Sequence, residues 1–241
     1  MQESIYILGN GKMAKAIAKG LSKKYQTIFI VRNKNNCENS IHYDDFNIND
    51  KICILCFKPY NLDEISSKFL GQKAKIIISP LAGVSLNDLT KINAKHYLRI
   101  MPNIAAEYNK SCTTYVGNKN NEYFQKSLEI IQTFGSAIEC ESEKELNLAM
   151  AINGCAPAFL ALVAEAIANG GLSIGLKNEK AYELTKALFS SFESLIANNH
   201  PALIKEGVCS PAGVSIKGVN VLEDKAIRSA FIKAIKESAG V

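Results

Sequence analysis

The chain opens with a short apolar strand that runs into a glycine turn and then into a helix. The apolar run Ile5–Leu8 leads into Gly9 and Gly11, and helical spacing follows to Leu21. Gly9 permits a tight turn, Gly11 lets a pyrophosphate approach the backbone, and the small Ala14 lets the helix pack on the strand. Because unpaired N–H groups at a helix start attract phosphate, this segment predicts a dinucleotide site.

The second apolar run, Thr27–Val31, ends in the basic residues Arg32 and Lys34 with Asn33 between them. A ribose with a free 2′-hydroxyl calls for an acidic residue about 20 positions beyond the glycines, and Arg32 stands there instead. A guanidinium binds a phosphate dianion and cannot accept a hydrogen bond from a hydroxyl. The sequence therefore favours NADP(H) over NAD(H). The alternative is that Arg32 and Lys34 only solvate a loop.

Composition limits the class of protein. The 241 residues are 47% hydrophobic and 21% charged, enough for a real core, and we expect two domains. The net charge of +5 is spread along the chain without interleaved aromatic residues, which favours a small anionic ligand over nucleic acid. We find no leader pattern and no apolar stretch of about 18 residues, so we expect a cytoplasmic protein without a membrane partner.

Seven cysteines, an odd number in apolar surroundings, indicate reduced intracellular thiols. Cys53 and Cys56 form a C-x-x-C, but they lie in an apolar run with the pattern of a buried strand, where positions i and i+3 point to opposite faces. Such thiols share neither a disulfide nor a metal. The three histidines are isolated, so no metal site is expected.

Strand and helix patterns alternate over residues 1–141, which predicts an α/β fold with a Rossmann-type, mostly parallel sheet. Beyond Val31 we expect strands at 52–57, 76–79, 97–100, 112–116 and 137–140, a helix at 121–134, and helices opened by the capping pairs Asn61–Glu64 and Ser85–Asp88. Three strands end in proline turns, at Pro59, Pro80 and Pro102. Ligands of open sheets bind at these strand ends, so the three loops are predicted to wall a nicotinamide.

Residues 142–241 have helical patterns only and form the second predicted domain. A capping box at Ser142 and Glu145 opens it, and the turn 154–157 precedes a helix at 158–168 that is apolar nearly all round. At 11 residues this helix is too short for a membrane, so we expect a second subunit to cover it. Glu165 within it is either a paired interface carboxylate or a helix-end charge. Apolar stripes at 181–196 and 227–235 indicate core or subunit contact.

Between these stripes the segment 208–219 is rich in small residues and hydroxyls, with a proline and two glycines. Uncovered N–H groups at a helix start there would suit a carboxylate.

The motifs, in this order and spacing, resemble the pyrroline-5-carboxylate reductase family over almost the whole chain. The matching blocks are Gly9–Met13, Phe57–Pro59, Ala82–Gly83, Arg99–Asn103, Asn153–Phe159, His200–Pro201 and Cys209–Ser215. The resemblance implies NAD(P)H-dependent reduction of 1-pyrroline-5-carboxylate to L-proline, the last step of proline synthesis. It also implies a substrate site in the helical domain, which forms a homodimer and larger rings of dimers.

We expect the cofactor contacts at the glycine turn, the basic loop and the strand ends: Leu8, Gly9, Asn10, Gly11, Lys12, Met13, Arg32, Asn33, Lys34, Cys56, Phe57, Lys58, Pro59, Pro80, Leu81, Ala82 and Asn103. The resemblance assigns the substrate to Ser210, Val214, Ser215 and Asn198, and makes Ser215 the proton donor to the imine nitrogen.

The chain departs from the family pattern at Asn153, Cys155, Ala156, Ala212 and Val214. Alanine at position 212, where the family has glycine, is expected to exclude a positive φ. Two other functions stay open: a reductase of another cyclic imine or keto acid, with Lys58 as the candidate for alkoxide chemistry, and a non-catalytic NADPH-binding module.

Overall fold

The computed structural model describes residues 3–33, 37 and 39–240, which form two compact units, Met1–Gly154 and Cys155–Val241. The expected division was after residue 141. The units divide later because helix α5 (Glu143–Met150) packs on the sheet of the first unit, where Leu146 lies against Met101 and Cys140.

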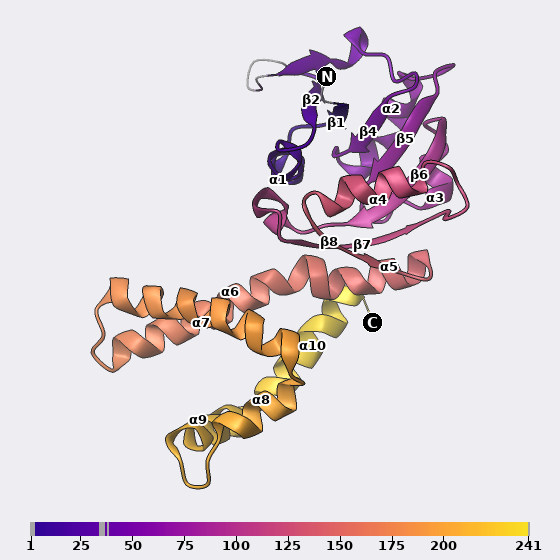
Figure 1. Ribbon diagram of the computed structural model, residues 1–241. Coiled ribbons are helices and arrows are strands. Elements are labelled where there is room, and N and C mark those ends of the chain that lie inside the picture. Colours follow the sequence, from indigo (N-terminus) through magenta and orange to yellow (C-terminus); the bar gives the residue numbers. More distant parts are fainter. Residues whose placement is uncertain (1–2, 34–36, 38, 241) are drawn as a thin grey trace. The chain divides into compact units, whose positions relative to one another are not determined.

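The first unit is built on one eight-stranded sheet, in the order β3-β2-β1-β4-β5-β6-β7-β8 (Figure 1). Every neighbouring pair is parallel except β6 and β7, which confirms the predicted mostly parallel Rossmann-type sheet. The strands are β1 (Ser4–Leu8), β2 (Gln26–Val31), β3 (Ser40–His42), β4 (Ile52–Leu55), β5 (Ala74–Ser79), β6 (Ala94–Met101), β7 (Ser111–Gly117) and β8 (Gly135–Glu139).

Helices cover both faces of the sheet. On one face α1 (Lys12–Leu21) and α4 (Phe124–Gln132) bury their apolar sides against alternate strand residues such as Ile7 and Ile54. On the other face α2 (Leu62–Ser67) and α3 (Leu86–Leu89) pack against the intervening residues. Cys53 belongs to the second core, whereas Cys56 packs against the first, so the two thiols lie on opposite faces as predicted.

Several local predictions are confirmed and others are wrong. Ser85 and Asp88 form the expected capping box on α3. The Asn61–Glu64 capping pair is wrong, because Asn61 makes no capping hydrogen bond and Glu64 binds Arg32 instead. Strand β3 was not predicted, since it has only three residues, and β4 ends at Leu55 rather than at residue 57.

The expected turn at 154–157 is also wrong. A π-helix, Ala151–Cys155, joins α5 to α6 (Ala156–Ser173), so the chain is helical from Glu143 to Ser173. Ser142 still caps the start of α5 by accepting from the Glu145 N–H, but the Glu145 carboxylate accepts from the Glu141 N–H rather than closing the box.

The joined helix is long enough to cross a membrane, unlike the 11-residue helix expected from the sequence. It has 31 residues and a mean hydropathy of 1.7 over its most apolar window, of which only 17% is buried. Within the described residues it is the one helix that could cross a membrane by length and composition, which corrects the expectation that no stretch is long enough.

The second unit consists of helices only, as predicted. After α6 come α7 (Asn178–Asn198), α8 (Pro201–Val208), α9 (Val214–Asp224) and α10 (Ile227–Ala239). Helices α6 and α7 pack side by side as a hairpin (Figure 1). Among the described residues of this unit, only Ala168, Ala181 and Thr185 are buried.

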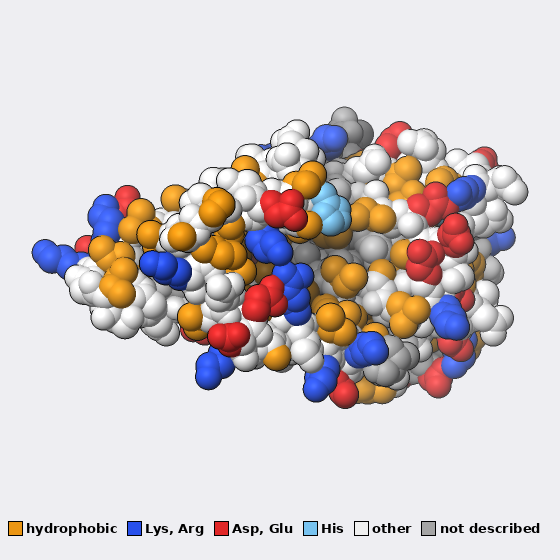
Figure 2. All heavy atoms as spheres, turned by 90° about the horizontal axis from the view of Figure 1, so that it is seen from below, with side chains coloured by type: hydrophobic (Ala, Val, Ile, Leu, Met, Phe, Trp, Pro, Cys, Tyr) orange, Lys and Arg blue, Asp and Glu red, His pale blue; other side chains and the backbone are white. Residues whose placement is uncertain are grey.

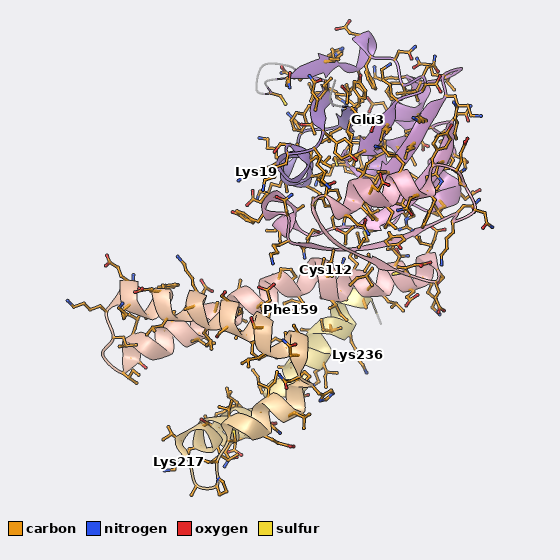
Figure 3. The ribbon with its side chains drawn as sticks, in the orientation of Figure 1. Glu3, Lys19, Cys112, Phe159, Lys217 and Lys236 are labelled. Carbon is orange, nitrogen blue, oxygen red and sulfur yellow. The ribbon has the colours of Figure 1, made fainter. Side chains whose placement is uncertain are left out.

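Apart from Ala181, the predicted stripe at 181–196 is therefore exposed or half-buried in the single chain, as is the stripe at 227–235, and hydrophobic side chains lie open on the face shown in Figure 2. Leu188 and Leu195 on α7 are each more than 40% exposed. An apolar groove of about 280 Å³ runs between α6 and α10, with Phe159 and Phe231 among its walls. Figure 3 shows Phe159 on α6.

A partly buried ion pair fixes α5 to the sheet. The Arg99 side chain on β6 is 2% exposed, and its Nη1 lies 2.5 Å from the Glu143 carboxylate. Its Nη2 donates to Asn147, while the Glu143 carboxylate also accepts from the Leu86 N–H. Removing one member of such a pair leaves the other charge buried without its partner.

We expect Glu143→Gln to lower the free energy of unfolding by about 2 kcal/mol, less than for a fully buried pair because Glu143 is 34% exposed. Glu139→Gln is the matched control, since its partner Lys119 is 61% exposed, and it should cost less than about 0.5 kcal/mol. Urea unfolding at one fixed protein concentration measures both. Equal losses would contradict a special role for the Arg99 pair.

Candidate active site

A cleft of about 780 Å³ opens at the carboxyl ends of β1, β2, β4 and β5, where the predicted contacts converge. Twelve predicted cofactor residues line it: Gly9, Asn10, Gly11, Lys12, Met13, Arg32, Asn33, Cys56, Phe57, Lys58, Pro80 and Leu81. The topology explains this convergence, because the carboxyl ends of parallel strands meet at one edge of the sheet.

The two glycines of the first turn have different physical roles. Gly9 has φ +111°, and a Cβ there would lie 2.5 Å from the Cys56 carbonyl oxygen, so the turn lies directly against the end of β4. A Cβ on Gly11 would meet no atom within 4 Å. Gly11 precedes α1, and no side chain caps this helix start. The turn thus offers open backbone and free N–H groups to an anion, which fits a dinucleotide diphosphate.

The charges of the cleft also fit an anion. Its described lining includes Lys12, Arg32 and Lys58 and contains no carboxylate. One acid lies directly beside it: the Glu64 carboxylate on α2 accepts a hydrogen bond from Arg32 Nη2 at 2.6 Å.

Five residues that were not predicted also line the cleft, namely Val31, Tyr43, Leu55, Asn61 and Ile65. Val31 and Leu55 are the last residues of β2 and β4, so the strand ends themselves were the available signal. Tyr43 follows the unpredicted strand β3, and its side chain is buried. Burial raises the pKa of its phenol.

Four predicted cofactor residues do not line the cleft, and a fifth, Lys34, lies outside the described residues. Leu8 is fully buried at the end of β1. Pro59 begins a short 3-10 helix, and Ala82 is exposed in the loop after β5.

The fourth, Asn103, makes structural contacts instead. Its carboxamide oxygen accepts from the Ala105 N–H, and its nitrogen donates to the Asn153 carbonyl in the π-helix. In return, the Asn153 carboxamide donates to the carbonyls of Met101 and Cys112. The two asparagines thus tie the π-helix to the end of β6 and the start of β7, and Asn153, a departure from the family pattern, has a clear structural role.

The predicted substrate loop forms a tight turn in front of α9. The Gly213 N–H donates to the Ser210 carbonyl at 3.0 Å, with Pro211 and Ala212 between them. Ala212 has φ +57°, so the expectation that alanine excludes a positive φ here is wrong. The positive φ at the third position, after Pro211 at the second, makes this a type II turn, which usually has glycine where Ala212 stands.

Helix α9 begins at Val214, as the segment predicted, and no side chain caps it. Val214 is 87% exposed, and Ser210 and Ser215 are also exposed. Lys217 marks this helix in Figure 3. Asn198 lies at the end of α7, where its carboxamide donates to the Ser194 carbonyl of the same helix. Within the described residues, no group of three or more His, Cys, Asp or Glu side chains could hold a metal ion.

Comparisons with known proteins find relatives of both units. A family model for pyrroline-5-carboxylate reductase dimerisation matches residues 143–240, and a model for F420-dependent NADP oxidoreductases matches residues 4–83. A pyrroline-5-carboxylate reductase of Helicobacter pylori is 38% identical over 98% of this chain and 97% of its own. The chain belongs to the pyrroline-5-carboxylate reductase family.

Solved structures of the family have the same fold. A pyrroline carboxylate reductase of Plasmodium falciparum with NADP bound matches with a TM-score of 0.86 at 21% identity, over 99% of this chain and 97% of that one. A 1-pyrroline-5-carboxylate reductase of Streptococcus pyogenes matches with a TM-score of 0.78 at 29% identity, over 99% and 98%.

We expect Ala212→Gly to raise the free energy of unfolding by about 1 kcal/mol, because glycine adopts a positive φ without the steric cost that alanine pays. Ala187→Gly is the control. This exposed alanine lies inside α7, where glycine should destabilise by about 1 kcal/mol. Thermal or urea unfolding measures the stability of both variants. If both changes destabilise the protein, Ala212 is not strained.

Proposed function

We propose that this chain reduces 1-pyrroline-5-carboxylate to L-proline, with NADPH as the preferred reductant. The observation that carries the proposal is the match along 98% of the chain to a protein of that name, together with the glycine-cradled cleft. The NADP oxidoreductase model over residues 4–83 supports NADP as the cofactor. Neither a reductase of another imine or keto acid nor a non-catalytic module accounts for so extensive a match.

The first unit provides the cofactor site. Gly11 and the uncapped start of α1 hold the diphosphate, Arg32 holds the 2′-phosphate, and the loops at Phe57 and Pro80 wall the nicotinamide ring. When bound, the dinucleotide supplies the hydride.

The second unit provides the substrate site. The uncapped N–H groups at the start of α9 hold the carboxylate, and the hydroxyls of Ser210 and Ser215 add donors. Ser215 passes a proton from solvent to the neutral imine nitrogen, which makes the ring carbon a good hydride acceptor, and Asn198 contributes a polar group beside the ring. Positioning supplies most of the rate.

We further propose that the protein acts as a cytoplasmic homodimer, with rings of dimers as the larger assembly. The dimerisation model over 143–240 and the exposed apolar surface of α6 support the dimer. Glu143 at the start of the joined helix is bound to Arg99 of the sheet, which favours a second copy over lipid as the cover of this surface. All seven cysteines are free, which supports a reducing compartment.

The activity is tested with a panel of 1-pyrroline-5-carboxylate, a six-membered cyclic imine and a keto acid, each with NADPH and NADH. We expect turnover to be highest with the first substrate. Ser215→Ala should lower kcat/KM about tenfold or more and leave NADPH affinity unchanged, because the hydroxyl contacts only the substrate. An equal loss of cofactor affinity would contradict this role, and turnover of another panel member alone would overturn the substrate.

The dimer is tested at the groove between α6 and α10. Phe231→Asp places a charge in an apolar wall and should convert a dimer to monomers, with a lower melting temperature, as light scattering and calorimetry would show. Lys233→Asp on the same helix is the control and should leave the mass unchanged. A monomeric wild-type protein at micromolar concentration would contradict the proposal, and the wild-type mass distinguishes a dimer from a ring.

A further inference from the structure

We propose that Glu64 is a cofactor-specificity residue. Its carboxylate competes with a 2′-phosphate for Arg32 and accepts a hydrogen bond from a 2′-hydroxyl, so the protein uses NADH as well and its preference for NADPH is small. The inference rests on the proposed cofactor site and adds a residue from a different element to it.

The geometry brings the two charges together from separate parts of the chain. Arg32 follows β2 and Glu64 lies on α2, yet Nη2 of Arg32 is 2.6 Å from the Glu64 carboxylate. Both side chains are 52% exposed, so the pair lies at the rim of the cleft and is accessible to a ligand. Arg32 itself lines the cleft.

Among the described residues, the groups around this pair leave it intact. Tyr43 lies close to both residues, and besides burial the nearby Arg32 lowers and Glu64 raises the pKa of its phenol. Two other acids nearby are bound elsewhere: Asp63 to Lys91 at 2.5 Å, and Asp44 to Lys68 at 2.7 Å.

Glu64 affects NADPH and NADH differently because the two cofactors differ in the group at the ribose 2′-position. A 2′-phosphate needs the guanidinium N–H groups that Glu64 already occupies, and the carboxylate repels the dianion. A 2′-hydroxyl carries no charge and donates a hydrogen bond, which a carboxylate accepts. Arg32 therefore favours the phosphorylated cofactor, while Glu64 opposes this preference from the neighbouring helix.

The test is direct binding of NADPH and NADH, followed by nicotinamide fluorescence or calorimetry at low and high salt. Glu64→Gln removes the charge and keeps the shape. We expect it to tighten NADPH binding about fivefold without tightening NADH, and we expect the gain to shrink at high salt because both charges are exposed. In an Arg32→Gln background, the same change should tighten NADPH binding by less, because only the repulsion between the carboxylate and the phosphate is then relieved.

Asp63→Asn is the matched control. It removes the same charge one residue away, where the partner is Lys91, and the ratio of the two affinities should stay at the wild-type value. An unchanged ratio in Glu64→Gln, or an equal rise in both variants, would overturn the role of Glu64. Turnover with 1-pyrroline-5-carboxylate is measured separately. If the protein binds both cofactors but shows no turnover, only the proposed function is contradicted. If the wild-type protein binds neither cofactor, both the proposed function and the role of Glu64 are overturned.

Discussion

The cleft depends on how tightly the first turn lies against the neighbouring strands. The Gly9 N–H donates to Ile30 of β2, and the Cys56 N–H donates to Leu8 of β1, both at 2.8 Å. No Cβ fits between Gly9 and the Cys56 carbonyl, so only glycine allows both hydrogen bonds at once. The start of α1 is thereby held beside the ends of β2 and β4, and the residues that follow these strands face one space.

The helical unit, unlike the first unit, is not held together by close internal packing. Its helices bury only three of their described side chains and leave large apolar residues exposed, so this unit has little core of its own. Apolar surface of this extent needs a cover, because burial supplies most of the free energy that opposes chain entropy. The loop before α9, which we propose binds the substrate, also lies on this unit.

Prediction worked where the signal was local. The signal is carried by a short stretch of sequence both in the strand, glycine turn and helix at the start of the chain and in the Ser85–Asp88 capping box. It failed where a distant residue competed. Glu64 does not take part in the expected helix cap, because it binds Arg32, which lies 32 residues away in the sequence. The turn at 154–157 became a π-helix whose Asn153 binds the carbonyls of Met101 and Cys112.

The sequence by itself determined the fold class, the dinucleotide turn and the helical second unit, because hydrophobic period and glycine position act over a few residues. Only the tertiary structure decided which strand ends share a cleft, that Ala212 accepts a positive φ, and that an acid neutralises Arg32. The shared cleft and the Arg32 pair depend on contacts between segments far apart in the sequence, and the positive φ belongs to the type of turn that precedes α9.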